Sequence, residues 1–341
     1  MEMLNSSSLM LKSDLWQTII GWFGSWIHNY GWAIIVFTIA LKLILLPLDI
    51  FQRVSSQKQS RFMRVMQPEL QALQVKYAND KDRLNQETSK LYKKYNMNMG
   101  GMCLSMLLPL IFSLVIFFTL FGSLRSYGNE KLYTTYQQMD SAVVQELGER
   151  SLDEISDKSN LVIVVKDEYA KVKKQNGWLW VKNVWKSDTA VSQFVDFEDY
   201  ASYKNLSGEA KDLAKDRYDF IVSTIDGEKQ SNNGYFVLII LAAAVSFLTQ
   251  FISAKLMTPK GQKMNTMNKV MFAVMPISMI IFASTSNAVF GLYIITNSVM
   301  STLISTTLTL IMNHRDKGKT DAELIQTKKV EVVEYSRNYK K

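Results

Sequence analysis

Long apolar stretches alternate with charged segments along this chain. Residues 99–121, 234–254 and 270–312 contain no Asp, Glu, Lys or Arg. A hydrocarbon core of about 30 Å requires roughly 20 apolar residues in a helix, so the first two stretches predict one transmembrane helix each. The third is too long for one span and is interrupted by STSN at 284–287, which predicts two short helices. The apolar segment 31–53 brings the expectation to five spans.

Two segments outside the spans have a helical period of their own. In 13–30 the apolar residues fall on one face, which is typical of an amphipathic helix lying flat in the membrane interface, with Ser13 as its expected N-cap. In 54–98 apolar residues spaced by three and four, including Met66 and Leu91, recur on both sides of a polar break. This pattern predicts two amphipathic helices that form an antiparallel hairpin.

Basic and acidic residues are distributed unevenly among the segments, and this distribution predicts the membrane topology. Residues 54–98 carry 9 Lys or Arg against 4 acids, 255–269 carry 4 against none, and 313–341 carry 8 against 5. Residues 122–233 carry 15 against 19. The positive-inside rule therefore places the three basic segments in the cytoplasm, with the N-terminus outside and the C-terminus inside. The net charge of +8 is accordingly no sign of a nucleic-acid site.

The chain is thus predicted to be an all-α polytopic membrane protein. Its expected parts are an interfacial helix (13–30), five spans (31–53, 99–121, 234–254, 270–284 and 288–312), a cytoplasmic hairpin (54–98), a large extracytoplasmic insertion (122–233), a cytoplasmic loop (255–269) and a basic tail (313–341). Within the insertion, GWLWVKNVW (177–185) favours a strand-like segment or one resting on the membrane, and the pattern assigns no fold to the rest.

Enzymatic chemistry finds no support in the residues. The single cysteine, Cys103, allows no intrachain disulfide, and two histidines make no metal cluster. The metalloprotease, phosphate-loop and serine-hydrolase motifs are missing. We expect no catalytic residue, no metal and no cofactor, and no enzyme. The N-terminus also lacks the pattern of a cleavable secretory signal.

A lysine lies in the middle of the first predicted span, within TIALKLILLPL (38–48). A cation near the centre of a spanning helix costs roughly 2.5–3.5 kcal/mol, so Lys42 requires a partner, water or an escape route. Polar residues accompany it: Thr38 one turn earlier, Ser105 in the second span, and Tyr293, Asn297, Ser301, Ser305 and Thr309 spaced by four in the last span.

Two interpretations of these residues stay open. The Ser and Thr hydroxyls can bond back to carbonyls of their own helices, and Lys42 can extend towards the cytoplasm or reach Asp49. Asp49, however, has a nearer partner in Arg53 at i+4. Alternatively the polar faces line a water-filled cavity, which we favour because intramembrane ionisable groups are functional by default.

Four stretches resemble the YidC/Oxa family of membrane protein insertases. They are YGWAIIVFTIALKLILLPLDIFQRVSSQKQSRFMRVMQPELQALQVKY (30–77), LYKKYNMNMGGMCLSMLLPLIFSLVIFFTLFGSLR (91–125), LWVKNVWKSD (179–188) and MPISMIIFASTSNAVFGLYIITN (275–297). They occur in the family's order and cover nearly the whole chain outside 126–176 and 189–233. The sequence departs from the family in having lysine at the usual arginine (Lys42), Ser105 at an expected proline and Ile294 at an expected aromatic.

The resemblance implies five helices around a hydrophilic groove that receives newly made membrane proteins. The implied groove residues are Lys42, Thr38, Ser105, Tyr293, Asn297, Ser301 and Ser305, and the implied cytoplasmic recruitment residues are Arg61, Arg64, Lys76, Lys90, Lys93 and Lys94. Implied partners are nascent membrane proteins and the lipid bilayer, with the Sec translocon, the ribosome and the signal-recognition-particle receptor as further candidates. The implied location is the bacterial plasma membrane.

Two other functions compete with insertion. The same polar intramembrane stripe would suit a channel or transporter, although five spans do not divide into equal inverted halves. The chain could also be a membrane-anchored binding protein that works through residues 122–233. We favour the insertase because the motifs fall on a topology that the charge pattern predicts independently.

Overall fold

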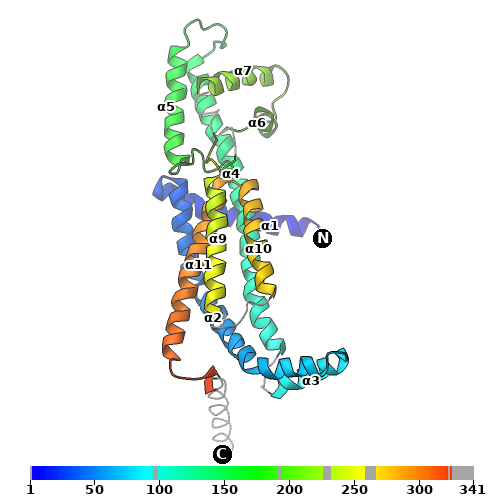
Figure 1. The fold of residues 1–341 in the computed structure, drawn as a ribbon. Helices are drawn as coiled ribbons and strands as arrows, with labels where there is room; N and C mark the ends of the chain where they lie inside the picture. The colour runs from blue at the N-terminus through cyan, green and yellow to red at the C-terminus, as the bar shows by residue number, and fades with distance from the viewer. Residues whose placement is uncertain are drawn as a thin grey trace, which may run out of the picture. The chain divides into compact units, whose positions relative to one another are not determined.

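The computed structural model describes residues 2–94, 99–189, 194–225, 232–257, 266–321 and 323–324. Within these residues every regular element is a helix, and the β pairing is one isolated bridge between Trp178 and Val181. The helices (Figure 1) are α1 (Glu2–Ile27), α2 (Tyr30–Lys76), α3 (Lys81–Lys94), α4 (Met99–Leu147), α5 (Ser159–Asn176), α6 (Phe197–Lys204), α7 (Gly208–Thr224), α9 (Val237–Met257), α10 (Thr266–Thr285) and α11 (Ala288–Arg315).

The chain forms two compact units, and α2, α4, α9 and α11 each contribute to both. The first unit comprises Met1–Leu41, Phe117–Gln250 and Thr266–Val299. The second unit comprises Lys42–Ile116, Phe251–Asn265 and Met300–Lys341.

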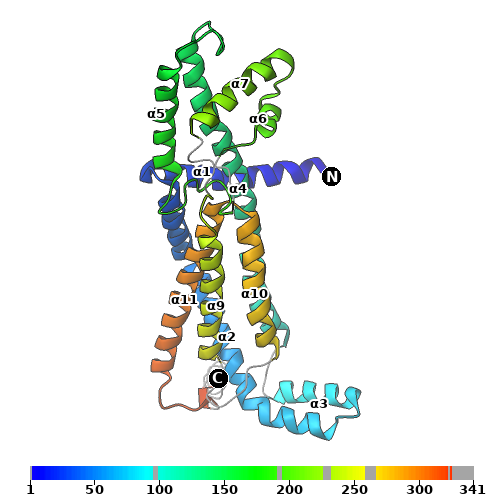
Figure 2. The same ribbon diagram turned by 45° about the horizontal axis from the view of Figure 1, so that its top comes forward.

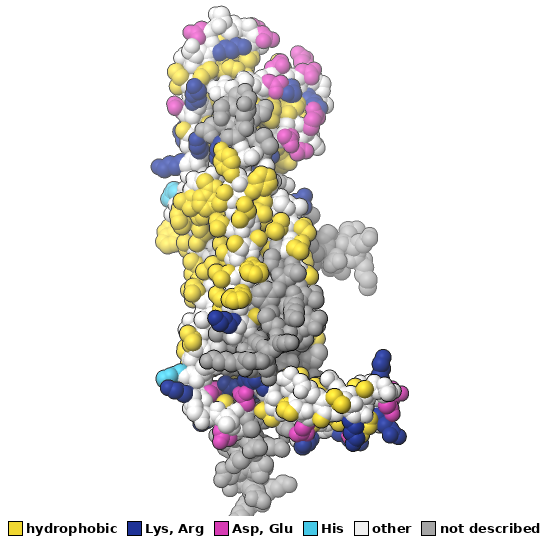
Figure 3. All heavy atoms as spheres, viewed as in Figure 1, with side chains coloured by type: hydrophobic (Ala, Val, Ile, Leu, Met, Phe, Trp, Pro, Cys, Tyr) yellow, Lys and Arg dark blue, Asp and Glu magenta, His cyan; other side chains and the backbone are white. Residues whose placement is uncertain are grey.

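Among the described residues, four helices are long and apolar enough to cross a membrane. They are α2, α4 from Ile111 onward, α9 and α11, with mean hydropathies of 2.4, 1.4, 2.2 and 1.5 over their most apolar windows. Only 17–39% of those windows is buried inside the protein, so lipid must cover most of their apolar side chains. Figure 3 shows such hydrophobic side chains gathered over α9. The predicted span 270–284 lies in α10, whose side chains are described only in part.

Two helices continue beyond the ends of the predicted spans. α2 has 47 residues and runs without a break from the first span into the hairpin, with Pro47 and Pro68 inside it. α4 has 49 residues and continues from the second span to Leu147. Polarity marks where a helix leaves the hydrocarbon, but the backbone hydrogen bonds have no reason to stop there. α1 begins at Glu2, so the prediction of Ser13 as an N-cap is wrong.

The core of the first unit forms around the segment 177–189. Trp185 is buried between two tyrosines, with ring centroids 4.9 Å from Tyr30 of α2 and 5.3 Å from Tyr127 of α4. The ammonium of Lys131 lies over both tyrosine rings. The Trp and Val residues of this segment therefore fill a core between helices. Of the two alternatives expected for 177–185, the strand-like one is reduced to the single bridge noted above.

The same segment satisfies polar groups where helices begin. The side chain of Asn233, fully buried, accepts the Asn183 N–H at 2.8 Å and donates to the Asn183 carbonyl at 2.7 Å. Asp188 accepts the N–H of Leu238 in the first turn of α9 at 3.1 Å. The carbonyl of Lys186 accepts the N–H of Ala288 at the start of α11 at 2.8 Å.

Helices α5, α6 and α7 pack around the distal part of α4 in the first unit (Figures 1 and 2). Tyr136 of α4 is buried there against Tyr200 and Tyr218. Arg217 of α7 binds Asp140 of α4 at 2.6 Å. The long segment between the second and third spans is therefore a small helical domain built on the end of α4.

In the second unit, α3 folds back along α2 as an antiparallel hairpin (Figure 2). Met66 and Leu91 are buried between the two helices, and the part-buried side chains of Phe62, Leu70, Leu73 and Tyr92 surround them. Lys94 binds Glu69 across the hairpin at 2.8 Å. The small apolar seam holds the hairpin together, because the residues around it on this part of α2 and on α3 are mostly polar or charged.

Met66→Ala should loosen this hairpin. The residue is fully buried, and truncating a buried methionine to alanine costs about 2–5 kcal/mol. Amide hydrogen exchange of α3 should therefore accelerate strongly in Met66→Ala. Val75→Ala, at a position 81% exposed on the same helix, is the matched control and should leave exchange unchanged. Equal exchange in the two variants would contradict the assigned seam.

Candidate functional site: a charged stripe on α2

One face of α2 carries a continuous polar stripe in the second unit. Its members are Lys42, Asp49, Arg53, Gln57, Ser60 and Arg64. Intervals of seven, four and three residues place side chains on the same face of an α-helix. The stripe begins inside the apolar span and ends in the hairpin, so it carries charge from hydrocarbon depth to the polar end of the helix.

Lys42 forms an ion pair two turns along its own helix. Its Nζ lies 3.4 Å from Oδ2 of Asp49, and the two side chains are 13% and 22% exposed. The expectation that Arg53 is the nearer partner of Asp49 is wrong, because Arg53 turns to α11 instead. Burying two charges costs about as much as their attraction returns, so the pair neutralises Lys42 without adding much stability.

Arg53 and Gln57 connect the stripe to α11. Nε of Arg53 donates to Oγ1 of Thr309 at 2.8 Å, and Nη2 donates to the same oxygen. The Thr309 hydroxyl in turn donates to the carbonyl of Ser305 at 2.7 Å. Gln57 donates to Asn313 at 3.1 Å. A chain of polar contacts thus joins the two helices within the second unit.

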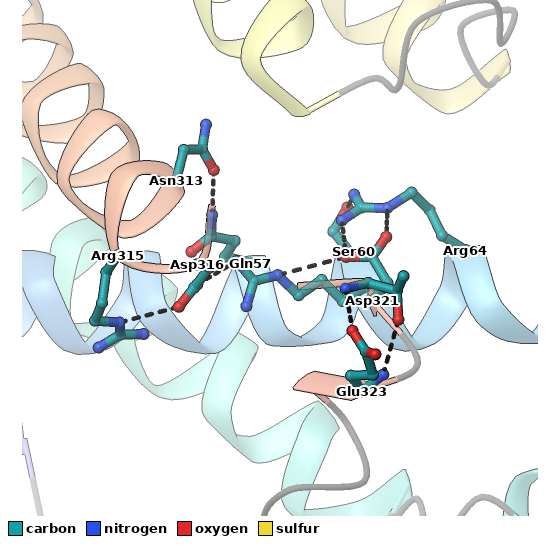
Figure 4. A network of polar contacts seen from close by, with 10 residues as sticks. Gln57, Ser60, Arg64, Asn313, Arg315, Asp316, Asp321 and Glu323 are labelled. Atoms are coloured by element: carbon teal, nitrogen blue, oxygen red, sulfur yellow. Dashed lines mark hydrogen bonds and ion pairs between the residues drawn. The ribbon is translucent and has the colours of Figure 1, made fainter. Parts of the chain in front are cut away.

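The chain after α11 binds the end of the stripe through two aspartates (Figure 4). Arg61 donates to Asp316 at 2.6 Å. Arg64 donates to both oxygens of Asp321, at 2.7 and 3.0 Å, which is the bidentate geometry of a strong charge-assisted pair. The hydrogen bond from Arg64 lowers the pKa of Asp321. Burial disfavours the Asp316 carboxylate, but hydrogen bonds from Arg61 and Arg315 outweigh it and lower its pKa too.

A cavity of about 250 Å³ lies between the stripe and this C-terminal segment. All of its lining residues except Leu324 have polar or charged side chains. The lining residues are Arg53, Gln57, Ser60, Arg61, Arg64, Thr309, Asn313, Asp316, Lys319, Asp321 and Leu324.

The predicted groove residues fall in both units. In the first unit Thr38 is fully buried and donates to the Ile34 carbonyl at 2.6 Å, and Tyr293 is buried against the ring of Phe290. Asn297, also in the first unit, is half-buried, as are Ser301 and Ser305 in the second. The side chain of Ser105 lies outside the described residues. Within the second unit the structure joins Lys42 to Asp49 and links Ser305, through Thr309, to Arg53.

The predicted recruitment residues divide into two groups. Lys76, Lys90, Lys93 and Lys94 are exposed on the α2–α3 hairpin, and Figure 3 shows basic side chains at its surface. Arg61 and Arg64 are on α2 as well, but their side chains are only 15% and 26% exposed and bind Asp316 and Asp321.

Sequence reasoning missed the contacts of Arg53, Asp316 and Asp321. The polar spacing beyond the first span was a usable signal, because Arg53, Gln57 and Ser60 continue the face of Lys42. No such signal exists for the aspartates, which pair with arginines more than 250 residues earlier in the chain.

The attachment of the C-terminal segment to α2 should depend on pH. Because the folded-state pKa values of Asp316 and Asp321 are lowered, the stabilisation is complete above the unfolded value of about 3.9 and is lost as the pH falls through the lowered values. Hydrogen exchange of residues 316–321, corrected for the intrinsic rate, should lose protection in that acid range. Asp321→Asn should lose part of the protection already at neutral pH. Protection that stays constant in both tests would refute the pairing.

Comparison with known proteins identifies the class. The family model described as the 60Kd inner membrane protein matches residues 22–317, which reach across both units. The chain therefore belongs to the 60 kDa inner membrane protein family, and its resemblance to the YidC group is confirmed. Together with the apolar helices, this makes it a multi-pass protein of the bacterial plasma membrane.

Several curated relatives carry the name membrane protein insertase YidC. The chain is 44% identical to that of Fusobacterium nucleatum over 101 residues (30% of this chain, 45% of the relative). It is 46% identical to that of Clostridium tetani over 93 residues (27% and 40%). It is 38% identical to that of Aromatoleum aromaticum over 116 residues (32% and 20%). Each match spans less than half of the relative's length.

Proposed function

We propose that this protein is a membrane protein insertase that moves newly synthesised membrane proteins into the lipid bilayer, alone or with the Sec translocon. It acts by binding and guiding, without catalytic chemistry, metal or cofactor. The observation that carries the proposal is the Lys42–Asp49 pair at 3.4 Å on an otherwise apolar span, in a chain whose family relatives are named insertases.

In this proposal the four apolar helices α2, α4, α9 and α11, together with α10, surround a hydrophilic groove that opens to the cytoplasm. The N-terminus is outside and the C-terminus inside, as the charge pattern predicts. Lys42 supplies the positive charge of the groove. Its polar lining comes from Thr38, Ser105, Tyr293, Asn297, Ser301 and Ser305.

Lys42 would guide a substrate rather than drive its insertion. An acidic residue in the outer tail of a substrate helix would replace Asp49 as the partner of Lys42. Because Lys42 would exchange one carboxylate contact for another, the net change in free energy would be small. Both side chains retain some exposure, so water weakens the attraction. The driving force is burial of the substrate's apolar span in lipid, worth about 25 cal/mol per Å².

The α2–α3 hairpin is the proposed site of recruitment. Lys76, Lys90, Lys93 and Lys94 are exposed on it, and an exposed basic surface suits anionic lipid and acidic partners. The ribosome, the signal-recognition-particle receptor and the Sec translocon are the proposed partners there. Arg61 and Arg64 join this surface only where the C-terminal segment releases them.

Replacing Lys42 tests the proposal in a reconstituted insertion assay with full-length protein in liposomes. Lys42→Ala should reduce insertion of a single-span protein with an acidic outer tail roughly fivefold to tenfold, which corresponds to about 1–1.4 kcal/mol. Lys42→Arg keeps the charge and should retain most activity. Lys58→Ala, at an exposed position of the same helix, is the control.

A second substrate with a neutral outer tail separates guiding from loss of fold. Lys42→Ala should insert it as well as the wild type does, because only the charge-dependent step is lost. If Lys42→Ala inserts both substrates at the wild-type rate, the groove charge plays no part in insertion and the proposal fails.

A further inference from the structure

Arg53 is a cation without a counter-charge among the described residues. Lys42 has Asp49, Arg61 has Asp316 and Arg64 has Asp321. The guanidinium of Arg53 instead directs two donors at one neutral oxygen, the hydroxyl of Thr309. A guanidinium has five N–H donors, and a hydroxyl brings no negative charge. Arg53 is therefore half-buried with its charge uncompensated and donors to spare.

The cavity beside Arg53 has a surplus of positive charge. Four of its lining residues are cations, Arg53, Arg61, Arg64 and Lys319, and two are carboxylates, Asp316 and Asp321. Both carboxylates are committed to Arg61 and Arg64, and Lys319 is attracted by the exposed Glu323 beside the lining, which leaves Arg53 unmatched. The neutral polar lining includes Ser60 and Asn313, which can hydrogen-bond to an anion.

The position of Arg53 along α2 indicates where the cavity lies relative to the membrane surface. Arg53 is the first basic residue after the apolar run of the first span, so it lies where phospholipid headgroups meet the cytoplasm. A volume of about 250 Å³ has room for a tetrahedral oxyanion, since a water molecule takes about 30 Å³.

We propose that this cavity binds a phosphate group through Arg53 and Lys319. The planar fork of Arg53 matches two phosphate oxygens, and Lys319 supplies a point charge from the opposite, C-terminal side. A bound phosphate would bridge α2 and the segment after α11, and so hold that segment in place. The phosphate can come from an anionic phospholipid of the inner leaflet or from a soluble phosphate ester. The site does not depend on insertion activity.

Binding measurements on the purified full-length protein test the site. Calorimetric titration with dihexanoyl phosphatidylglycerol should show saturable binding, whereas zwitterionic dihexanoyl phosphatidylcholine should bind much more weakly. Arg53→Gln should weaken phosphatidylglycerol binding roughly tenfold, and Lys319→Gln should weaken it in the same direction. Lys58→Gln removes one charge from an exposed position of the same helix and should leave binding within about twofold.

Thr309→Val distinguishes a binding site from a structural anchor. This variant removes the hydroxyl that Arg53 contacts but keeps the guanidinium. Binding should be retained or strengthened, since more donors become available to the phosphate. If Arg53→Gln fails to fold, Lys319→Gln still tests the site. Lys319 is exposed and outside the helices, so its replacement should leave the fold intact.

The outcomes separate the sources of the phosphate. Lipid binding that inorganic phosphate does not displace assigns the site to a headgroup. Saturable binding of inorganic phosphate that is lost in Arg53→Gln assigns it to a soluble phosphate, with the same residues. Equal weakening in Arg53→Gln and Lys58→Gln would reduce the effect to general surface charge and overturn the proposal. Preferential binding of a carboxylate-rich peptide over both phosphate probes would also overturn it.

Discussion

The second unit depends on the need to pair the cations of α2. This helix begins as an apolar span yet carries Lys42, Arg53 and Arg64 on one face, and an unpaired cation in low-dielectric surroundings is costly. Lys42 pairs with Asp49 on the same helix and Arg64 with a carboxylate beyond α11, whereas Arg53 has only a neutral hydroxyl on α11. These contacts fix the end of α11 and the following segment against α2. The polar cavity lies among these charged side chains.

In the first unit, the backbone N–H groups at the starts of α9 and α11 require hydrogen-bond acceptors. Helix starts leave N–H groups without partners in their own helix, and where these groups are buried they need acceptors from elsewhere in the chain. The segment around Trp185 supplies acceptors for α9 and α11 while Trp185 itself packs on Tyr30 and Tyr127. The segment between the second and third spans is thus part of the core that holds the spans. A function confined to that segment is accordingly less attractive than one in which it supports the membrane helices.

The sequence pattern predicts the parts whose signals are local. The four described apolar helices, the seam at Met66 and Leu91 and the unusual lysine all follow from periodicity and composition. The choice of Thr309 by Arg53 and the fold around Trp185 depend on residues far apart in the chain, which spacing does not reveal. α2 and α4 are longer than the predicted spans because helical hydrogen bonds continue past the end of an apolar run.

Photo-crosslinking during synthesis tests the central claim most directly. A crosslinking residue at Ser301, half-buried on the polar side of α11, should capture a nascent single-span protein, and the yield should fall in Lys42→Ala. The same residue at Leu303, 56% exposed on another face of α11, should capture far less. Equal capture at both positions, or none at Ser301 in a normally folded protein, would contradict a groove that receives substrates beside Lys42.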